Sequence, residues 1–420
     1  MVLARHEHPA AGPPGERSGA RPRDSASVAA SSGRIRSRDL LSAGVRISVE
    51  LAPLRVPDRT SVVEAVRALI GFGADARAGR TFGGGRWTYD PATLDAQAER
   101  MVRSLPPELS GDEGLPRLRE AVDPDLPVTV FLGEDRASLC IDHRLGDGFL
   151  GVMLTAGALS GGKPPVVFAH ADDDDPLPAA AAATFLRHPR RVADVVHDRL
   201  TDRRTPHAGP TVPAPRGSLE LISRRMDHDT YRALAAWSRG RVPLSVATMF
   251  ALHIALRRVG LPVMNEGAVL VDLRRYLPSG RSTLGNFVVG HPVSVSAGID
   301  AAGARFHRDL HVGRPLAALA AGILTSRWRR EAPTTIPAAV RPTVSDMGFL
   351  RALEPLPWAS EGGVVRVSVD PSSPNGITAL TAVLRRRLNV SMSFDGSMYD
   401  RDTIAAATEL LCRDPEGLLP

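Results

Sequence analysis

The chain has 420 residues, of which 43% are apolar and 23% are charged, so it can form two core-bearing lobes and lacks a disordered composition. Its 52 basic residues are all arginine except Lys163, and against 46 acidic residues they give a formal charge of +6. Because the arginines are scattered and only 5% of residues are aromatic, we do not expect nucleic-acid binding.

Neither a disulfide framework nor insertion into a membrane is expected. The chain has two cysteines, Cys140 and Cys412. No apolar run approaches the ~20 residues that a membrane span needs. No apolar signal core follows the N-terminus either, so a cytoplasmic protein is expected.

Composition divides the chain into four parts. Residues 1–45 are rich in Arg, Ser, Pro, Gly and Ala without an apolar period, which predicts a disordered tail. Residues 46–200 form the predicted N-terminal lobe. The charged, proline-rich residues 201–216 read as a linker, and residues 217–420 form the C-terminal lobe.

Within the first lobe, period-2 and period-3.6 patterns predict mixed strands and helices. Ser61 and Glu64 predict a capping box at the start of one helix, and the three glycines at 83–85 predict a hairpin turn or strand start. In chain order, the expected elements are a strand at 46–51, helices after Ser61 and at 92–105, a hairpin at 126–132 and 137–141, and a helix at 149–159.

The second lobe has a similar mixture, with Ser245 as the expected cap of one helix. The expected elements are strands at 218–222, 268–274, 286–296, 363–370 and 385–394, and helices at 228–240, 246–258 and 401–412. Strands and helices alternate without a regular βαβ repeat, so the predicted fold class is α+β with two lobes.

The most informative stretch is His143-Arg144-Leu145-Gly146-Asp147-Gly148, an H-x-x-x-D-G motif between the predicted hairpin and the following helix. A neutral imidazole can accept a proton near pH 7, which makes His143 a candidate general base. Asp147 can fix the geometry of the turn, and Gly148 permits a tight backbone.

This motif resembles the active-site signature of the chloramphenicol acetyltransferase-like superfamily, which includes condensation domains, BAHD acyltransferases and polyketide-associated acyltransferases. Further segments resemble the family in the right order over residues 46–415: Asp272-Leu273-Arg274, Leu284-Gly285-Asn286-Phe287 and Ser345-Asp346-Met347-Gly348. No carrier or adenylation domain is seen, so the resemblance is to a stand-alone member.

The resemblance implies two lobes with an active-site tunnel between them. It implies that His143 deprotonates an alcohol or amine acceptor, which attacks an acyl thioester of coenzyme A or of a carrier protein's phosphopantetheine. Asp147 would form a structural ion pair with Arg274, and Asn286 and Ser345 would be candidate donors to the tetrahedral oxyanion. Neither a metal nor a bound cofactor is implied.

Two alternatives to a simple acyltransferase stay open. One is a condensation-like enzyme that joins carrier-bound partners through an amide or ester. The other is a degenerate member that binds a carrier or ligand without turnover. Many condensation domains have a second histidine where this chain has Asp142, although BAHD-type enzymes lack it.

Overall fold

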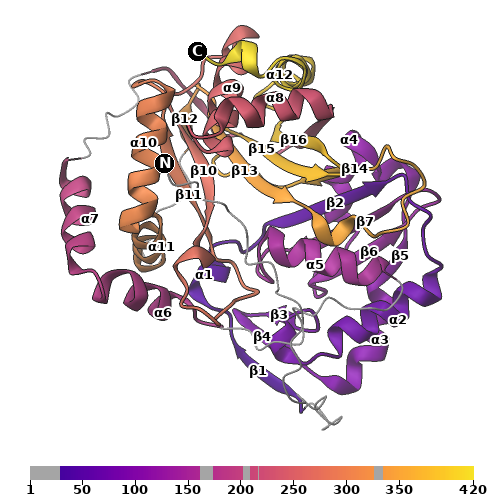
Figure 1. The fold of residues 1–420 in the computed structure, drawn as a ribbon. Helices are drawn as coiled ribbons and strands as arrows, with labels where there is room; N and C mark the ends of the chain where they lie inside the picture. The colour runs from indigo at the N-terminus through magenta and orange to yellow at the C-terminus, as the bar shows by residue number, and fades with distance from the viewer. Residues whose placement is uncertain (1–28, 161–173, 202–208, 216, 326–333) are drawn as a thin grey trace, which may run out of the picture.

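The computed structural model describes residues 29–160, 174–201, 209–215, 217–325 and 334–420. Helices pack on two mixed sheets, one in each lobe, so the α+β fold class predicted from the sequence is confirmed (Figure 1). No helix in these described ranges is long and apolar enough to cross a membrane.

The N-terminal lobe is built on a five-stranded sheet in the order β14-β2-β7-β6-β5. Its strands are β2 (Arg46–Ala52), β5 (Val102–Ser104), β6 (Val128–Leu132), β7 (Ala137–Asp142) and β14 (Val364–Ser368). Three helices pack together beside it: α2 (Arg59–Ile70), α3 (Leu94–Met101) and α5 (Gly148–Leu159). The predicted hairpin is present, because β6 and β7 pair antiparallel.

The C-terminal lobe contains a six-stranded sheet in the order β11-β10-β13-β15-β16-β9. Its strands are β9 (Leu219–Met226), β10 (Glu266–Asp272), β11 (Val288–Ser294), β13 (Arg341–Phe349), β15 (Gly376–Leu384) and β16 (Arg387–Asp395). Its main helices are α8 (His228–Ser238), α9 (Leu244–Arg258), α10 (Ile299–Val312), α11 (Arg314–Thr325) and α12 (Arg401–Arg413). Ten of the 15 residues of α9 are buried, so this helix is the centre of the lobe's core.

Strand β14 ties the two lobes together. It belongs to the second half of the chain, yet it pairs antiparallel with β2 of the first lobe (Figure 1). Its backbone also donates hydrogen bonds to β16: Val365 N to Asn389 Oδ1 at 3.3 Å and Val367 N to Ser391 Oγ at 3.1 Å. The predicted boundary at residues 201–216 therefore does not separate two independent sheets.

The predicted linker and tail are partly structured. Within the linker, β8 (Thr211–Pro213) pairs with β12 (Thr335–Pro337). In the predicted tail, β1 (Ser31–Arg34) pairs with β4 (Arg86–Tyr89), and α1 (Ser37–Leu40) follows. The prediction of disorder was thus wrong for residues 29–45, because that segment is held by charge pairs and strand pairing rather than by an apolar period. Residues 1–28 lie outside the described part.

Several local predictions also need correction. Helix α2 starts earlier than expected, because Asp58 is its cap and accepts hydrogen bonds from Ser61 N and Ser61 Oγ. Helix α9 is preceded by Pro243 and has no side-chain cap, so Ser245 does not serve as one. The helix predicted over 92–105 ends at Met101, where the chain enters β5. Strands β13 and β15 and helices α10 and α11 were not predicted.

We expect the segment before Val45 to matter for stability. Asp39 is 1% exposed and lies 2.5 Å from the buried guanidinium of Arg77. A chain that starts at Val45 leaves Arg77 without this carboxylate, and its free energy of unfolding in urea should fall by about 3–5 kcal/mol. A chain that starts at Ala29 is the matched control. Equal urea midpoints for the two truncated chains would contradict this expectation.

Candidate active site

His143 lies at the junction of the lobes, in the turn that leads from β7 into α5. Its backbone N donates to Val45 O at 3.0 Å, and its side chain is half-buried. The ring atom Nδ1 is buried and has no hydrogen-bond partner in the described part of the chain. Because the ring is half-buried and Nδ1 is enclosed, Nε2 is the candidate ring nitrogen for a proton transfer.

Asp147 and Arg274 form a two-point ion pair between the lobes. Arg274 Nη1 donates to Asp147 Oδ2 at 2.8 Å, and Nη2 donates to Oδ1 at 3.2 Å. The same carboxylate accepts from Phe149 N, which caps α5, and from Phe287 N of the other lobe. Asp147 is 3% exposed, so it orders the turn and is not presented to a substrate.

Arg274 also binds two backbone carbonyl groups of the loop that precedes β11. Its Nε donates to Thr283 O at 2.9 Å and its Nη2 donates to Gly285 O at 3.1 Å. Burial by itself lowers the pKa of Arg274, but Asp147 and Asp272 outweigh it and the net pKa is raised. The guanidinium therefore keeps its charge, and the loop stays attached to the motif turn.

Asn286 contacts the motif directly. Its Nδ2 donates to the backbone O of His143 at 2.5 Å, and the side chain is buried. Asn286 therefore holds the backbone of the candidate base, a use that the sequence did not predict. Its predicted contact with an oxyanion stays a prediction.

Ser345 lies in β13, in register with Leu380 of β15. Leu380 packs against the core of the N-terminal lobe, so this face of β13 is turned toward the motif. The Ser345 side chain is half-buried, and no partner of its hydroxyl is found among the described residues. Its predicted role as an oxyanion donor stays a prediction.

The two glycines of the motif differ in what surrounds them. A Cβ at Gly146 would overlap the backbone O of Leu284, which cannot move without displacing the loop. A Cβ at Gly148 would meet only the flexible end of Met347, at 2.6 Å. The sequence indicated Gly148 as the required glycine, whereas the tighter packing is at Gly146.

Asp142 is engaged with its neighbour. Arg144 donates to it through Nε at 2.9 Å and Nη2 at 2.6 Å, and the guanidinium lies 4.7 Å from the ring centre of Phe82. The carboxylate is 4% exposed. Asp142 therefore stabilises the turn next to His143. Among the described residues, its carboxylate makes no hydrogen bond to the imidazole.

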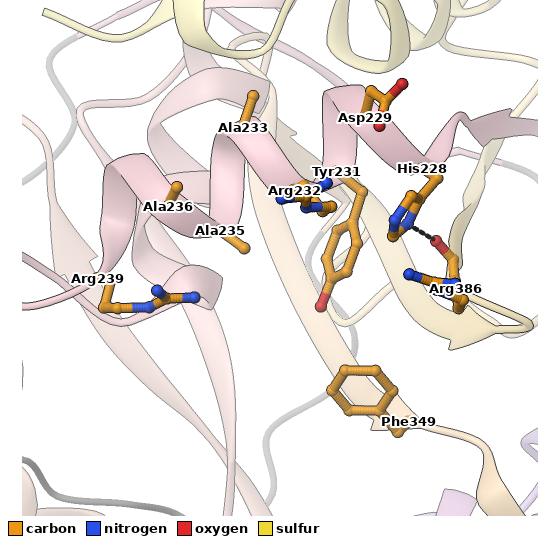
Figure 2. Close-up of a pocket in the computed structure, with 10 residues that line it drawn as sticks. All are labelled: His228, Asp229, Tyr231, Arg232, Ala233, Ala235, Ala236, Arg239, Phe349 and Arg386. Carbon is orange, nitrogen blue, oxygen red and sulfur yellow. Dashed lines mark hydrogen bonds between the residues drawn. The ribbon is translucent and has the colours of Figure 1, made fainter.

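A hollow of about 640 Å³ opens between α8, the end of β13 and the hairpin that joins β15 to β16 (Figure 2). Tyr231 points from α8 toward the half-exposed ring of Phe349. The hollow carries an arginine group, defined as Arg232, Arg239 and Arg386. No ion pair of these three side chains is found within the described ranges.

No group of three or more His, Cys, Asp or Glu residues that could hold a metal ion is found in the ranges described.

No protein-family model and no curated protein matches the sequence. Solved structures do match the fold. A trichothecene 15-O-acetyltransferase from Fusarium sporotrichioides superposes with a TM-score of 0.61 at 10% identity, covering 91% of this chain and 95% of that one. Polyketide synthase associated protein 5 from Mycobacterium tuberculosis gives 0.55 at 15% identity, covering 91% and 98%.

The condensation enzyme VibH of nonribosomal peptide synthesis gives a TM-score of 0.52 at 14% identity, covering 89% of this chain and 90% of that one. These structures share a two-lobed, chloramphenicol acetyltransferase-like fold, and the chain has this fold. The tunnel between the lobes stays a prediction.

The Asp147–Arg274 pair can be tested with a double-mutant cycle in urea. Asp147→Asn and Arg274→Gln should each lower the free energy of unfolding by about 3–5 kcal/mol, because each leaves a buried group without its partner. The losses should not add in the double variant. Asp272→Asn is the control, since that carboxylate is 58% exposed and its loss should cost about 1 kcal/mol or less. Fully additive losses would refute the pairing.

Proposed function

We propose that the protein is an acyltransferase that moves an acyl group from a thioester to an alcohol or amine, with His143 as the general base. The observation that carries this proposal is the geometry of His143. Its ring is half-buried at the junction of the lobes, while the main chain is fixed on both sides by Val45 and Asn286. The shared fold supports the proposal, since structures with this fold include an acetyltransferase and a condensation enzyme.

The proposed reaction has two steps. His143 Nε2 accepts the proton of the acceptor, whose oxygen or nitrogen attacks the thioester carbonyl carbon and forms a tetrahedral oxyanion. The oxyanion then collapses, the carbon–sulfur bond breaks, and His143 returns the proton to the leaving thiolate. Ser345, whose hydroxyl is free among the described residues, is the candidate donor to the oxyanion.

The arginine group of the hollow supports a donor that carries phosphate. Coenzyme A and phosphopantetheine both bear phosphates, which guanidinium groups bind well. Strand β13 connects this hollow to the motif: Met347 lies against Gly148, and Phe349, two residues further, lines the hollow. Although β13 is irregular between Asp346 and Phe349, two residues span at most ~7 Å, so one extended donor can reach both places.

The second candidate function is a condensation-like reaction between carrier-bound partners. The same hollow favours it, because a carrier-bound phosphopantetheine also presents a phosphate. A degenerate, non-catalytic member is less well supported. Asp142, which suggested it, is paired with Arg144 and not with His143.

His143→Ala should abolish acyl transfer without unfolding the protein. General-base assistance is worth roughly 10²–10⁴-fold, so the turnover number should fall by at least that lower figure. Turnover is measured by mass spectrometry of the acceptor, and circular dichroism of the same sample reports the fold. Turnover at the wild-type rate would exclude His143 as the base.

The arginine group can be tested with two donors. Arg232→Gln combined with Arg239→Gln should raise the KM for an acyl-coenzyme A by about tenfold or more, as expected for lost charge-assisted hydrogen bonds. The KM for the corresponding acyl-N-acetylcysteamine, which has no phosphate, should not change. Arg413→Gln, at an exposed position of α12, is the control for losing a positive charge away from the hollow. Equal effects on both donors would show that the hollow does not bind phosphate.

A further inference from the structure

A segment far from the motif in sequence contacts the same loop that holds His143. We infer that Asp39 is a positioning residue for His143 and acts through Asn286. The inference rests on the proposed function only in treating His143 as the base. The hydrogen bonds that it uses are present whatever reaction the protein catalyses.

Two hydrogen bonds in series connect Asp39 to His143. Asp39 Oδ1 accepts from the backbone N of Asn286 at 3.0 Å. The side chain of Asn286 then donates from Nδ2 to the backbone O of His143 at 2.5 Å. Asp39 is 1% and Asn286 6% exposed, so water does not compete strongly for these bonds.

Asp39 is itself fixed by two buried cations. Arg77 Nη2 lies 2.5 Å from Asp39 Oδ2, and Arg38 Nε lies 3.6 Å from Oδ1. The side chains of both arginines are at most 3% exposed. A buried carboxylate between two guanidinium groups has little freedom to turn, so its Oδ1 is held toward Asn286.

Arginine side chains contact the loop before Asn286 on two sides. Arg274, paired with Asp147, donates to Gly285 O at 3.1 Å. On the other side, a Cβ at Gly285 would overlap the guanidinium groups of Arg77 and Arg38. A shift of the loop would therefore disturb either the Arg274–Asp147 pair or the contacts of Arg77 and Arg38 with Asp39.

These contacts matter because no side chain that orients the imidazole is found among the described residues. In many catalytic sites, a carboxylate bonded to the second ring nitrogen sets the direction of the base. Here Nδ1 of His143 has no hydrogen-bond partner in the described ranges. The direction of the ring therefore depends on where the main chain of His143 is held, and Asn286 and Asp39 hold it.

The test compares two substitutions that remove the same charge. Asp39→Ala removes the acceptor for Asn286 N, whereas Asp39→Asn keeps an acceptor oxygen at that place. The two should lose similar stability. In Asp39→Ala the turnover number should fall about tenfold or more, while KM stays within about twofold of wild type. Asp39→Asn should retain most of the wild-type turnover number. Since both remove the carboxylate that lies 2.5 Å from Arg77, each is also made together with Arg77→Gln to keep the protein folded.

Asp174→Ala is the matched control. Asp174 lies in the same cationic cluster, 3.5 Å from Arg80 and 3.8 Å from Arg77, but no contact joins it to Asn286 within the described residues. Its loss should leave the turnover number within about twofold of wild type, because the hydrogen bonds to the loop persist.

A second readout does not require acyl transfer. The rate at which diethyl pyrocarbonate modifies His143, followed by peptide mass spectrometry, should change severalfold in Asp39→Ala and not in Asp174→Ala. If wild type shows no acyl transfer but this difference appears, the positioning role stands and the proposed function fails. Equal turnover and equal modification for Asp39→Ala and Asp39→Asn, or an equal effect of Asp174→Ala, would overturn the inference.

Discussion

The pairing of Asp147 with Arg274 is the interaction on which the rest of the site depends. It is the point where the motif turn of one lobe meets the loop before β11 of the other. A carboxylate that is almost fully buried needs several donors, and Asp147 has them from both lobes: the Arg274 guanidinium, Phe149 N and Phe287 N. Satisfying one buried charge therefore fixes the relative position of two segments that are far apart in the chain.

The loop at residues 283–287 transmits this constraint to the candidate base. Arg274 holds its carbonyl groups, Leu284 O lies against Gly146, and Asn286 reaches the backbone of His143. Close approach of two backbones is possible only where one residue has no side chain, which accounts for the glycine in the middle of the motif. The imidazole is thus placed by its main chain.

The two sheets are not independent units either. Strand β14 extends the sheet of the first lobe while side chains of β16 accept hydrogen bonds from its backbone. These polar contacts are buried, so a relative shift of the lobes would leave backbone N–H groups without acceptors. A junction held in this way suits a site whose parts come from both lobes.

The α+β class, most strands and helices with a clear period, and the motif around His143 could be predicted from the sequence alone. Local patterns carry that information: β6, β7, α5 and α8 follow directly from alternation and helical spacing. The resemblance also indicated Arg274 as the partner of Asp147. The prediction of disorder was wrong for residues 29–45, because Arg38 and Asp39 are buried as charge partners and leave no apolar pattern to detect.

Which polar groups meet could not be predicted without the packing of the segments. Asp39 and Asn286 are 247 positions apart, and no local rule links a carboxylate in one segment to a backbone N–H in another. The need for glycine at 146 depends on the position of Leu284 O, which belongs to the other lobe. Periodicity reports how each segment faces a core, whereas a site made of long-range hydrogen bonds is fixed by how the segments pack.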